Sequence, residues 1–131
     1  MQYLLMIYTA ESVDDSLSAP EMGRLMENYG RFHEELEGAG AFAGGARLRG
    51  VSSATSVRRR DGEFTLTDGP FAETKEQLGG YYLVEAASLD EAVQWAKKIP
   101  SVDLGTIEVR PVWPMEDDPL ETTDGSVRAE A

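Results

Sequence analysis

The chain has 131 residues, of which 41% are hydrophobic and 27% are charged, and this composition fits one globular domain with a hydrophobic core. It contains no cysteine, which excludes disulfides and thiolate chemistry and suits a reducing cytoplasm. The formal net charge of -12 disfavours nucleic acid as a partner, because an acidic surface repels phosphates.

The N-terminal segment predicts a strand. Residues Tyr3 to Tyr8 are apolar or aromatic on both alternating faces, which is typical of a central strand in a sheet. The segment lacks the basic residues of a signal peptide, and its apolar run is too short to cross a bilayer. We therefore expect a cytoplasmic location and no membrane association. Residues Thr9 to Leu17 are polar and predict a loop.

Two segments have the pattern of amphipathic helices. The first begins at a capping box, Ser18-Ala19-Pro20-Glu21, and glycines at 38 and 40 predict its end. The second begins at a similar box, Ser88-Leu89-Asp90-Glu91, and ends at Pro100. Helical spacing predicts the buried stripes, which are Met22, Leu25, Met26, Tyr29, Phe32, His33 and Leu36 in the first helix and Leu89, Ala92, Val93, Ala96 and Ile99 in the second.

The other segments predict strands and one hairpin. Residues 41–49 and 80–85 predict strands, and the glycine pairs at 44–45 and 79–80 indicate bulges. Residues 54–60 and 63–67 flank Asp61-Gly62, which is a strong hairpin signal. Residues 106–113 alternate apolar with charged side chains and predict the last strand. The arginines at 58–60 are interpreted as a solvated edge that discourages strand pairing.

The order of these elements is β-α-β, hairpin, β-α-β, which predicts a ferredoxin-like α+β fold, βαββαβ with an extra β-hairpin. Residues 1–113 form the domain, and residues 114–131 form an acidic tail that is expected to be disordered or docked on a partner. Both helices then cover one face of the sheet. The other face also carries apolar side chains, and we therefore expect a homodimer that covers it.

The most specific motif is the loop and strand at residues 68–82, DGPFAETKEQLGGYY. Together with the strand at 3–8 and the ending at 107–112, it resembles the DGPF-type branch of the YCII-related domain family over residues 1 to 113. The resemblance implies a dimeric ferredoxin-like α+β barrel. It also implies two kinds of function. Some members resemble small enzymes acting on ring compounds, such as a dehydrochlorinase, and others are linked to alternative sigma factors and transcription initiation.

The candidate catalytic residues are Asp68, His33 and Tyr29. The wider family has been proposed to use a His-Asp pair; its helix histidine aligns near Tyr29, and Asp68 is the counterpart of the acid, whereas His33 lies one turn later. Asp68 could instead hold an Asx turn, and His33, the only histidine, could be a packing residue.

The candidate substrate-binding residues are Arg49, Lys75, Tyr8 and Arg110. Lys75 is either an anion anchor or part of a solvated loop. Arg49 and Arg110, like Arg47 and Glu108, alternate with apolar neighbours, and they either bind a carboxylate or phenolate or form an interfacial ion-pair network. Tyr8 is either a core residue or a hydrogen-bond donor at a cavity wall.

The sequence has no metal-ligand cluster, nucleotide-binding loop or nucleophile elbow, so we expect no metal and no cofactor. The first hypothesis is a homodimer with a pocket beside Asp68, on the dimer-covered sheet face, for a small aromatic or acidic metabolite. Its chemistry would be proton transfer, as in a lyase, an isomerase or a dehalogenase-like elimination. The second is a regulatory or binding protein that works with a sigma factor. A third is a protein that only dimerises.

Overall fold

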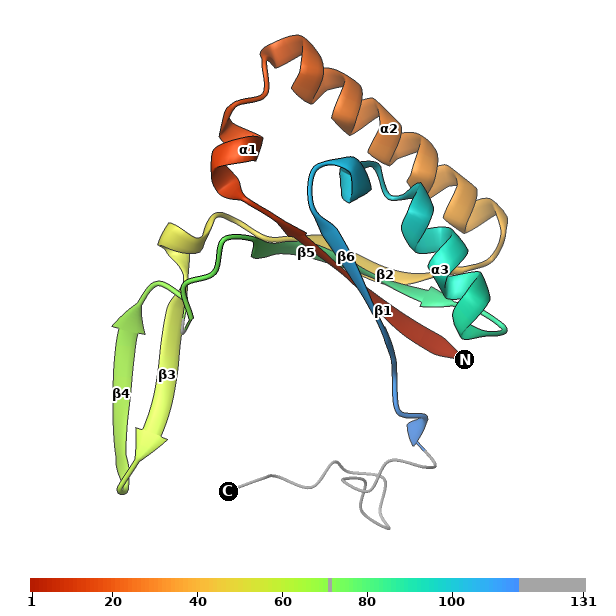
Figure 1. Ribbon diagram of the computed structural model, residues 1–131. Coiled ribbons are helices and arrows are strands. Elements are labelled where there is room, and N and C mark those ends of the chain that lie inside the picture. Colours follow the sequence, from red (N-terminus) through yellow and green to blue (C-terminus); the bar gives the residue numbers. More distant parts are fainter. Residues whose placement is uncertain (71, 116–131) are drawn as a thin grey trace.

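The computed structural model describes residues 1–70 and 72–115 of the chain. Figure 1 shows two long helices stacked on a curved sheet and a hairpin that projects from one end. The elements are β1 (Gln2–Thr9), α1 (Glu11–Asp15), α2 (Ala19–Gly38), β2 (Phe42–Arg47), η1 (Val51–Ser53), β3 (Thr55–Arg60), β4 (Glu63–Asp68), β5 (Gln77–Glu85), α3 (Leu89–Lys98), η2 (Pro100–Asp103) and β6 (Thr106–Pro111).

Four strands form one sheet in the order β2-β5-β1-β6, and all of its pairs are antiparallel. Strand β1 is central, as its apolar sequence predicts, because it pairs with β5 on one side and β6 on the other. Strands β3 and β4 form a separate two-stranded sheet. The predicted α+β class, with an antiparallel sheet and an extra hairpin, is therefore confirmed. The bulge predicted at 79–80 is present, with Gly79 as the unpaired residue. In β2 the register shifts between Phe42 and Gly44, just before the glycine pair where the bulge was predicted.

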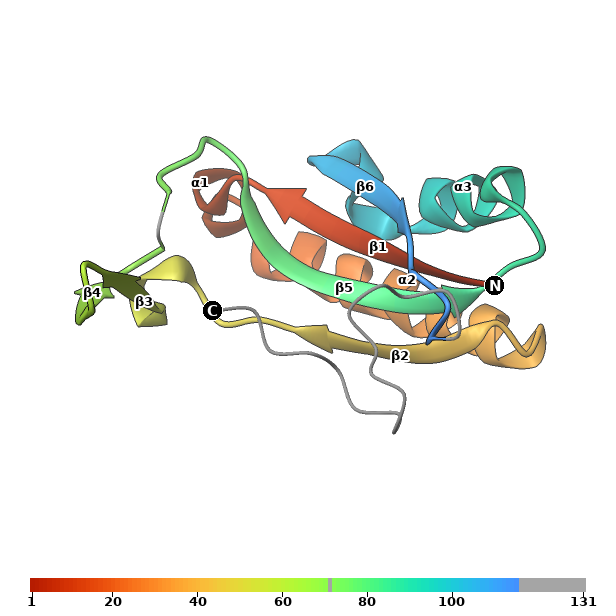
Figure 2. The same cartoon turned by 90° about the horizontal axis from the view of Figure 1, so that it is seen from below.

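Helices α2 and α3 cover the same face of the sheet, and the hydrophobic core lies beneath them (Figures 1 and 2). Leu5 in β1 and Val84 in β5 are fully buried from the sheet side. Leu36 in α2 and Ile99, directly after α3, are fully buried from the helix side. These side chains fix the C-terminal half of α2 and the end of α3 to the sheet.

The helix starts follow the sequence with one difference. At Ser18 both bonds of the capping box form, since its side chain accepts from the Glu21 amide and the Glu21 carboxylate accepts from the Ser18 amide. At Ser88 only the first bond forms, and the Glu91 carboxylate accepts from the Ala87 amide instead. The segment 9–17, predicted as a loop, contains the short helix α1. None of the residues of α1 is buried, so the sequence has no apolar stripe that would predict it.

The predicted apolar stripe of α2 is buried only in its second half. Phe32 and Leu36 are buried, whereas Met22, Leu25 and Tyr29 are half-buried and Met26 is exposed. The N-terminal half of α2 therefore stands off the sheet and leaves space beneath it. In α3 the expected burial of Leu89 was wrong, because its position next to the Ser88 cap leaves it 50% exposed.

No helix in residues 1–70 and 72–115 covers the opposite face of the sheet, which we call the open face (Figure 2). Residues that pair directly across strands share a face, so Leu4 lies beside Leu83 and Met6 beside Tyr81 on the open face. The register with β6 adds Glu108 and Arg110 to the same surface. This face is thus apolar in the middle and charged along its β6 edge.

One glycine sets the distance between η2 and the central strand. A Cβ on Gly105 would lie 2.0 Å from the carbonyl oxygen of Tyr8 and 2.9 Å from the Thr9 side chain. Real side chains do not tolerate either separation. Only glycine therefore lets β6 begin this close to the end of β1.

Candidate functional site

A cavity of about 440 Å³ lies between the N-terminal half of α2 and the sheet. This volume falls in the range of pockets that bind small organic ligands, which is roughly 300–1,000 Å³. Its roof is apolar and comes from the half of α2 that does not reach the sheet. Its wall includes Phe42 of β2 and Tyr82 of β5, whose rings stand 6.4 Å apart at 72°. The residues of the roof are Met22, Leu25 and Met26.

Part of the cavity floor is backbone without side chains. Gly45 and Gly80 line it, and each passes close to a neighbouring strand. A Cβ on Gly45 would lie 2.9 Å from the Tyr81 carbonyl oxygen, and one on Gly80 would lie 2.9 Å from the Ala46 carbonyl oxygen. Glycine at these two positions both permits the close strand pairing and leaves open space above it.

The inner end of the cavity is polar and centres on Tyr29. Its hydroxyl oxygen lies 2.6 Å from Oγ of Ser101, which is buried at the start of η2. Burial raises the pKa of Tyr29, and the hydrogen bond with Ser101 partly opposes this shift. The charge of Asp14 raises the pKa of Tyr29 further, and the charge of Arg47 lowers it. Tyr29 is therefore a neutral hydroxyl at physiological pH, suited to donate a hydrogen bond.

Helix α1 closes one side of the cavity, held by two side-chain hydrogen bonds. The buried Thr9 donates from Oγ1 to the Asp14 carboxylate at 2.7 Å. The Glu11 carboxylate accepts from the Val51 amide, also at 2.7 Å, and so ties α1 to the η1 turn. The carboxylates of Glu11 and Asp14 thus have structural partners while they also line the cavity.

Arg47 lines the cavity and carries a positive charge. It pairs with Gly80 across the strands and so lies on the helix-covered face, beside Ile7 in the next strand. Within residues 1–70 and 72–115, no carboxylate forms a salt bridge with its guanidinium. The Arg47 side chain is exposed, and a guanidinium that forms no ion pair within these residues is suited to bind a carboxylate or a phenolate.

His33 lies at the edge of the cavity. Its Nε2 atom is 2.7 Å from the Glu37 carboxylate one turn later on α2, and its ring packs edge-on against Phe42 with centroids 4.6 Å apart. The side chain is 40% exposed. Both contacts suit the packing interpretation, and they place the ring beside the apolar wall.

Only some of the site residues predicted from the sequence line the cavity. Tyr29 and His33 line the cavity, whereas Asp68 is the exposed last residue of β4 and Arg49 is exposed beyond β2, and neither lines it. The chain therefore does not bring Asp68 into one cluster with Tyr29 and His33. The cavity lies on the helix-covered face, not beside Asp68 on the open face where the sequence placed it, because the incompletely packed half of α2 leaves its space there.

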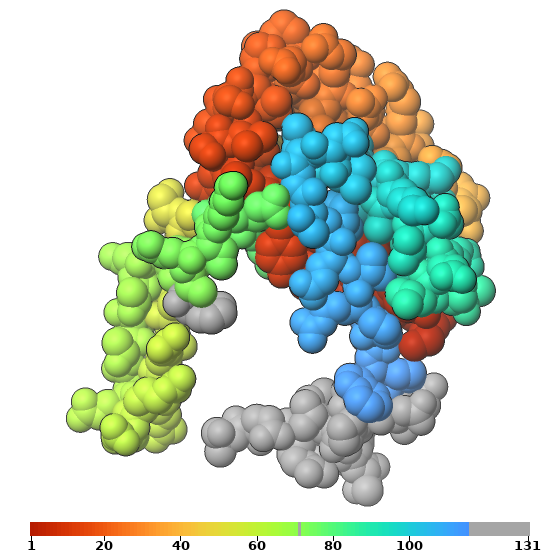
Figure 3. Space-filling view, in the orientation of Figure 1, coloured from red at the N-terminus to blue at the C-terminus, as the bar shows by residue number. Residues whose placement is uncertain are grey.

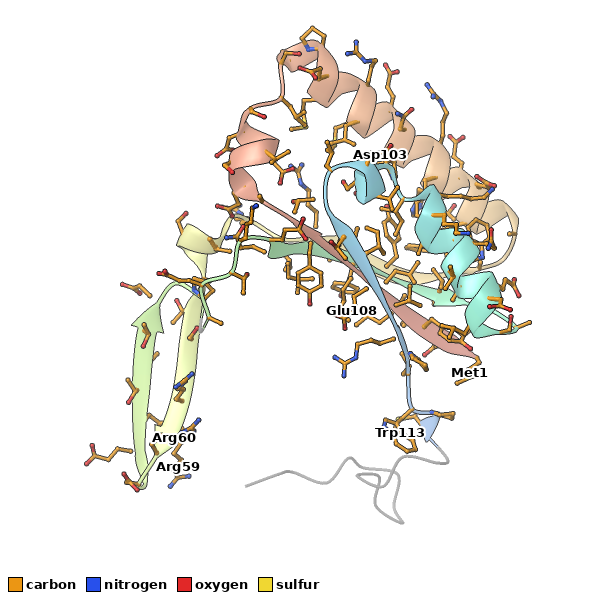
Figure 4. The ribbon with its side chains drawn as sticks, viewed as in Figure 1. Met1, Arg59, Arg60, Asp103, Glu108 and Trp113 are labelled. Atoms are coloured by element: carbon orange, nitrogen blue, oxygen red, sulfur yellow. The ribbon has the colours of Figure 1, made fainter. Side chains whose placement is uncertain are left out.

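Of the other three predicted residues, Tyr8 and Arg110 lie on the open face, and Lys75 lies in the loop between β4 and β5. Tyr8 and Lys75 line a second, shallow depression together with Glu108. Arg110 forms an ion pair with Glu108, with Nε 3.6 Å from Oε2. Figure 4 shows Glu108 on the side of the sheet away from the helices. The expected charged cluster is therefore partly formed, on the open face and apart from the cavity.

Sequence reasoning did not find Asp14 or Ser101. Asp14 falls in the segment predicted as a loop, and Ser101 follows the end of α3 without any pattern. One signal for the cavity was available in the sequence. The apolar stripe of α2 is longer than the part of it that packs against the sheet. The glycine pairs were identified, but only as bulges.

Neither a metal site nor a membrane span is found in the described ranges. No group of three or more His, Cys, Asp or Glu residues is placed to hold a metal ion in residues 1–70 and 72–115. No helix of these ranges combines the length and the apolar character that crossing a bilayer requires.

The sequence comparison decides the family. The family model described as "YCII-related domain" matches residues 1–116. The chain belongs to the YCII-related domain family. Within this family, the DGPF-type branch remains a prediction from the loop motif.

The chain is also similar to two known proteins. An uncharacterized protein of Rhizobium meliloti (strain 1021) is 40% identical over 114 residues, which cover 86% of this chain and 92% of that protein. A solved structure with a similar outline is 5-chloro-2-hydroxyhydroquinone dehydrochlorinase from Burkholderia phenoliruptrix AC1100, in complex with 2,5-dihydroxybenzoquinone. It is 17% identical, with a TM-score of 0.46, and the match covers 90% of this chain and 100% of that one.

Proposed function

We propose that this YCII-related protein binds a small aromatic or acidic metabolite in the cavity beneath α2. The observation that carries the proposal is the cavity itself, about 440 Å³ in volume, with an apolar roof and wall and a polar end at Tyr29. Apolar pockets with a few convergent polar groups are the usual form of small-molecule sites. The aromatic wall of Phe42 and Tyr82 suits a planar ligand.

Two groups would orient such a ligand. The Arg47 guanidinium would hold an anionic group, and the neutral Tyr29 hydroxyl would donate a hydrogen bond to a carbonyl or phenolic oxygen. Because Asp14 also lines the cavity and acts on the pKa of Tyr29, a proton acceptor and a proton donor are close together at the polar end. This arrangement supports cofactor-free acid–base chemistry, such as an elimination or an isomerisation.

We further propose that the protein is a homodimer with the two open faces opposed. Leu4, Met6 and Leu83 form an apolar patch on that face, and no helix of the described residues lies over it. A second copy is the simplest cover. The cytoplasmic location stays a prediction from the sequence, as does the alternative role with a sigma factor. Most of the acidic tail on which that alternative depends lies outside the described residues.

A ligand series tests the binding proposal. Hydroxylated benzoates and phenols would be titrated calorimetrically into the full chain, alongside neutral aromatic compounds of the same size. Arg47→Gln should weaken binding of the anionic compounds by about tenfold or more, since one charge-assisted bond contributes about 1.5–3 kcal/mol. Arg49→Gln is the matched control, because that exposed side chain does not line the cavity.

Two results would contradict the proposal. One is that no aromatic acid or phenol binds the wild-type chain. The other is that Arg47→Gln and Arg49→Gln weaken binding equally, because the affinity would then reflect general surface charge. A change in bound-ligand structure over time, followed by mass spectrometry, would separate catalysis from binding alone.

A further inference from the structure

The β3–β4 hairpin, which we call the arm, extends away from the rest of the domain (Figures 1 and 3). Its strands form their own sheet, and its turn has the left-handed conformation that Asp-Gly supplies, with φ of 53° at Asp61 and 80° at Gly62. All residues of β4 and all of β3 except Ser56 are exposed. A two-stranded hairpin without a partner surface is marginally stable in water.

One side of the arm is apolar. Val57 lies directly opposite Leu66, and Arg59 lies opposite Phe64, so these four side chains share one side. Val57, Leu66 and Phe64 are 61%, 69% and 66% exposed. The Arg59 guanidinium carbon lies 5.2 Å from the centre of the Phe64 ring, so even this cation is drawn onto the apolar side. Exposed apolar patches of this kind are typical of interaction surfaces.

Two hydrogen bonds join the two strands at the base of the arm. The Gly69 amide donates to the Ala54 carbonyl at 2.7 Å, and the Ser56 hydroxyl donates to the Gly69 carbonyl at 2.9 Å. The arm points toward the side of the open face (Figures 1 and 3). Trp113, 64% exposed, lies on the same side but near the opposite end of the molecule (Figure 4).

We propose that the arm packs its apolar side, formed by Val57, Phe64 and Leu66, against a second copy of this chain at the end that carries Trp113. This inference rests on the proposed homodimer. If the open faces are opposed around a twofold axis perpendicular to the view of Figure 1, each arm reaches the Trp113 end of the other copy. The two contacts are identical, and each one covers both the arm and an exposed tryptophan.

The charge distribution favours a second copy over other occupants. From residue 55 to residue 68, the three arginines at 58–60 balance Asp61, Glu63 and Asp68, so the arm has no net charge in a chain of -12. Two such chains repel one another except where a neutral surface makes the contact. A nucleic acid does not suit an arm with balanced charge and an apolar side, because binding to phosphates depends on an excess of cations.

The first test compares two substitutions on opposite sides of the same strand. Leu66→Ser removes an apolar contact, whereas Thr65→Ser changes the side that carries Arg58. Sedimentation should show that Leu66→Ser raises the dimer dissociation constant by about 100-fold or more, because both symmetric contacts lose a buried leucine. Thr65→Ser should leave it unchanged. Circular dichroism would verify that both variants are folded.

The second test uses the absence of cysteine in the chain. Phe64→Cys and Trp113→Cys variants would be mixed and oxidised mildly. A disulfide between the two different variants is the expected product. A disulfide between two Phe64→Cys chains, with none between the different variants, would show that the arms meet one another and would overturn the proposed contact.

The outcomes separate the arm from the dimer. If the wild-type chain sediments as a monomer at all concentrations, both proposals fail. If Leu83→Glu on the open face dissociates the dimer but Leu66→Ser does not weaken it, the homodimer stands and the arm contact is wrong. Ligand binding in the cavity is measured independently of either result.

Discussion

The Tyr29 hydroxyl lies 2.6 Å from Ser101 Oγ, and this contact joins α2 to the η2 turn across the polar end of the cavity. Ser101 is buried, and its hydroxyl has this partner where water is largely excluded. The hydrogen bond between Tyr29 and Ser101 therefore contributes to the stability of the fold and to the geometry of the cavity. It places a neutral phenol at a fixed point, and it fixes α2 where its packing against the sheet begins.

Removing the Tyr29 hydroxyl should lower stability modestly. Tyr29→Phe leaves Ser101 without its bond, at a cost of about 1 kcal/mol in the free energy of unfolding. Ser101→Ala should cost a similar amount, and the double variant should cost less than the sum, because the two residues share one interaction. Urea denaturation measures all three variants. Tyr81→Phe is the control, since no hydrogen bond of its hydroxyl is found within the described residues. Additive effects would contradict a direct bond.

Stability should also fall at alkaline pH. Burial raises the pKa of both Tyr29 and Tyr82 in the folded protein above the usual value of about 10. Above pH ~10 the unfolded chain loses these two protons while the folded protein still holds them. The free energy of unfolding is therefore unaffected by these tyrosines below pH ~10, and it decreases as the pH rises from there through the pKa values of the folded protein. Denaturation at a series of alkaline pH values measures this. Tyr29→Phe should reduce the slope, and an unchanged slope would assign the effect to other groups.

Glycine 105 should tolerate no side chain. Gly105→Ala places a Cβ against the Tyr8 carbonyl oxygen, so β6 must shift, and we expect a loss of at least about 2 kcal/mol in the free energy of unfolding. Gly30→Ala is the matched substitution, because nothing lies within 4 Å of a Cβ at that position of α2. That change should stabilise the protein by about 0.5–1 kcal/mol. Thermal denaturation of the two variants should therefore shift in opposite directions.

The Ser18 cap should matter for both the helix and the cavity. Ser18→Ala removes the side-chain acceptor of the Glu21 amide, which costs about 1 kcal/mol of helix stability. Because the loss falls on the half of α2 that roofs the cavity, ligand affinity should fall together with stability. Glu91→Ala at the start of α3 is the control, since it removes the Ala87 contact far from the roof. If both variants change affinity equally, the effect is a general one.

The sequence predicted elements better than it predicted the site. Caps, turn glycines and alternation are local signals, and they located α2, α3, the Asp61-Gly62 hairpin and the central strand β1. The site depends on distances between elements, which a single sequence does not contain. Asp68 was selected for its motif, but β4 carries it away from Tyr29. Tyr29 and His33 were identified because their stripe points at the sheet, and the gap beneath that stripe was not predictable from spacing alone.

Helix α2 is held to the sheet by one half only, with Phe32 and Leu36 as its buried side chains. A 20-residue helix of this kind has unequal local stability along its length. Amide hydrogen exchange should be fast over residues 19–28 and slow over residues 29–38, and a ligand in the cavity should protect the first set most. Ligand binding would then increase the local stability of the N-terminal half of α2 and leave the rest of the fold unchanged.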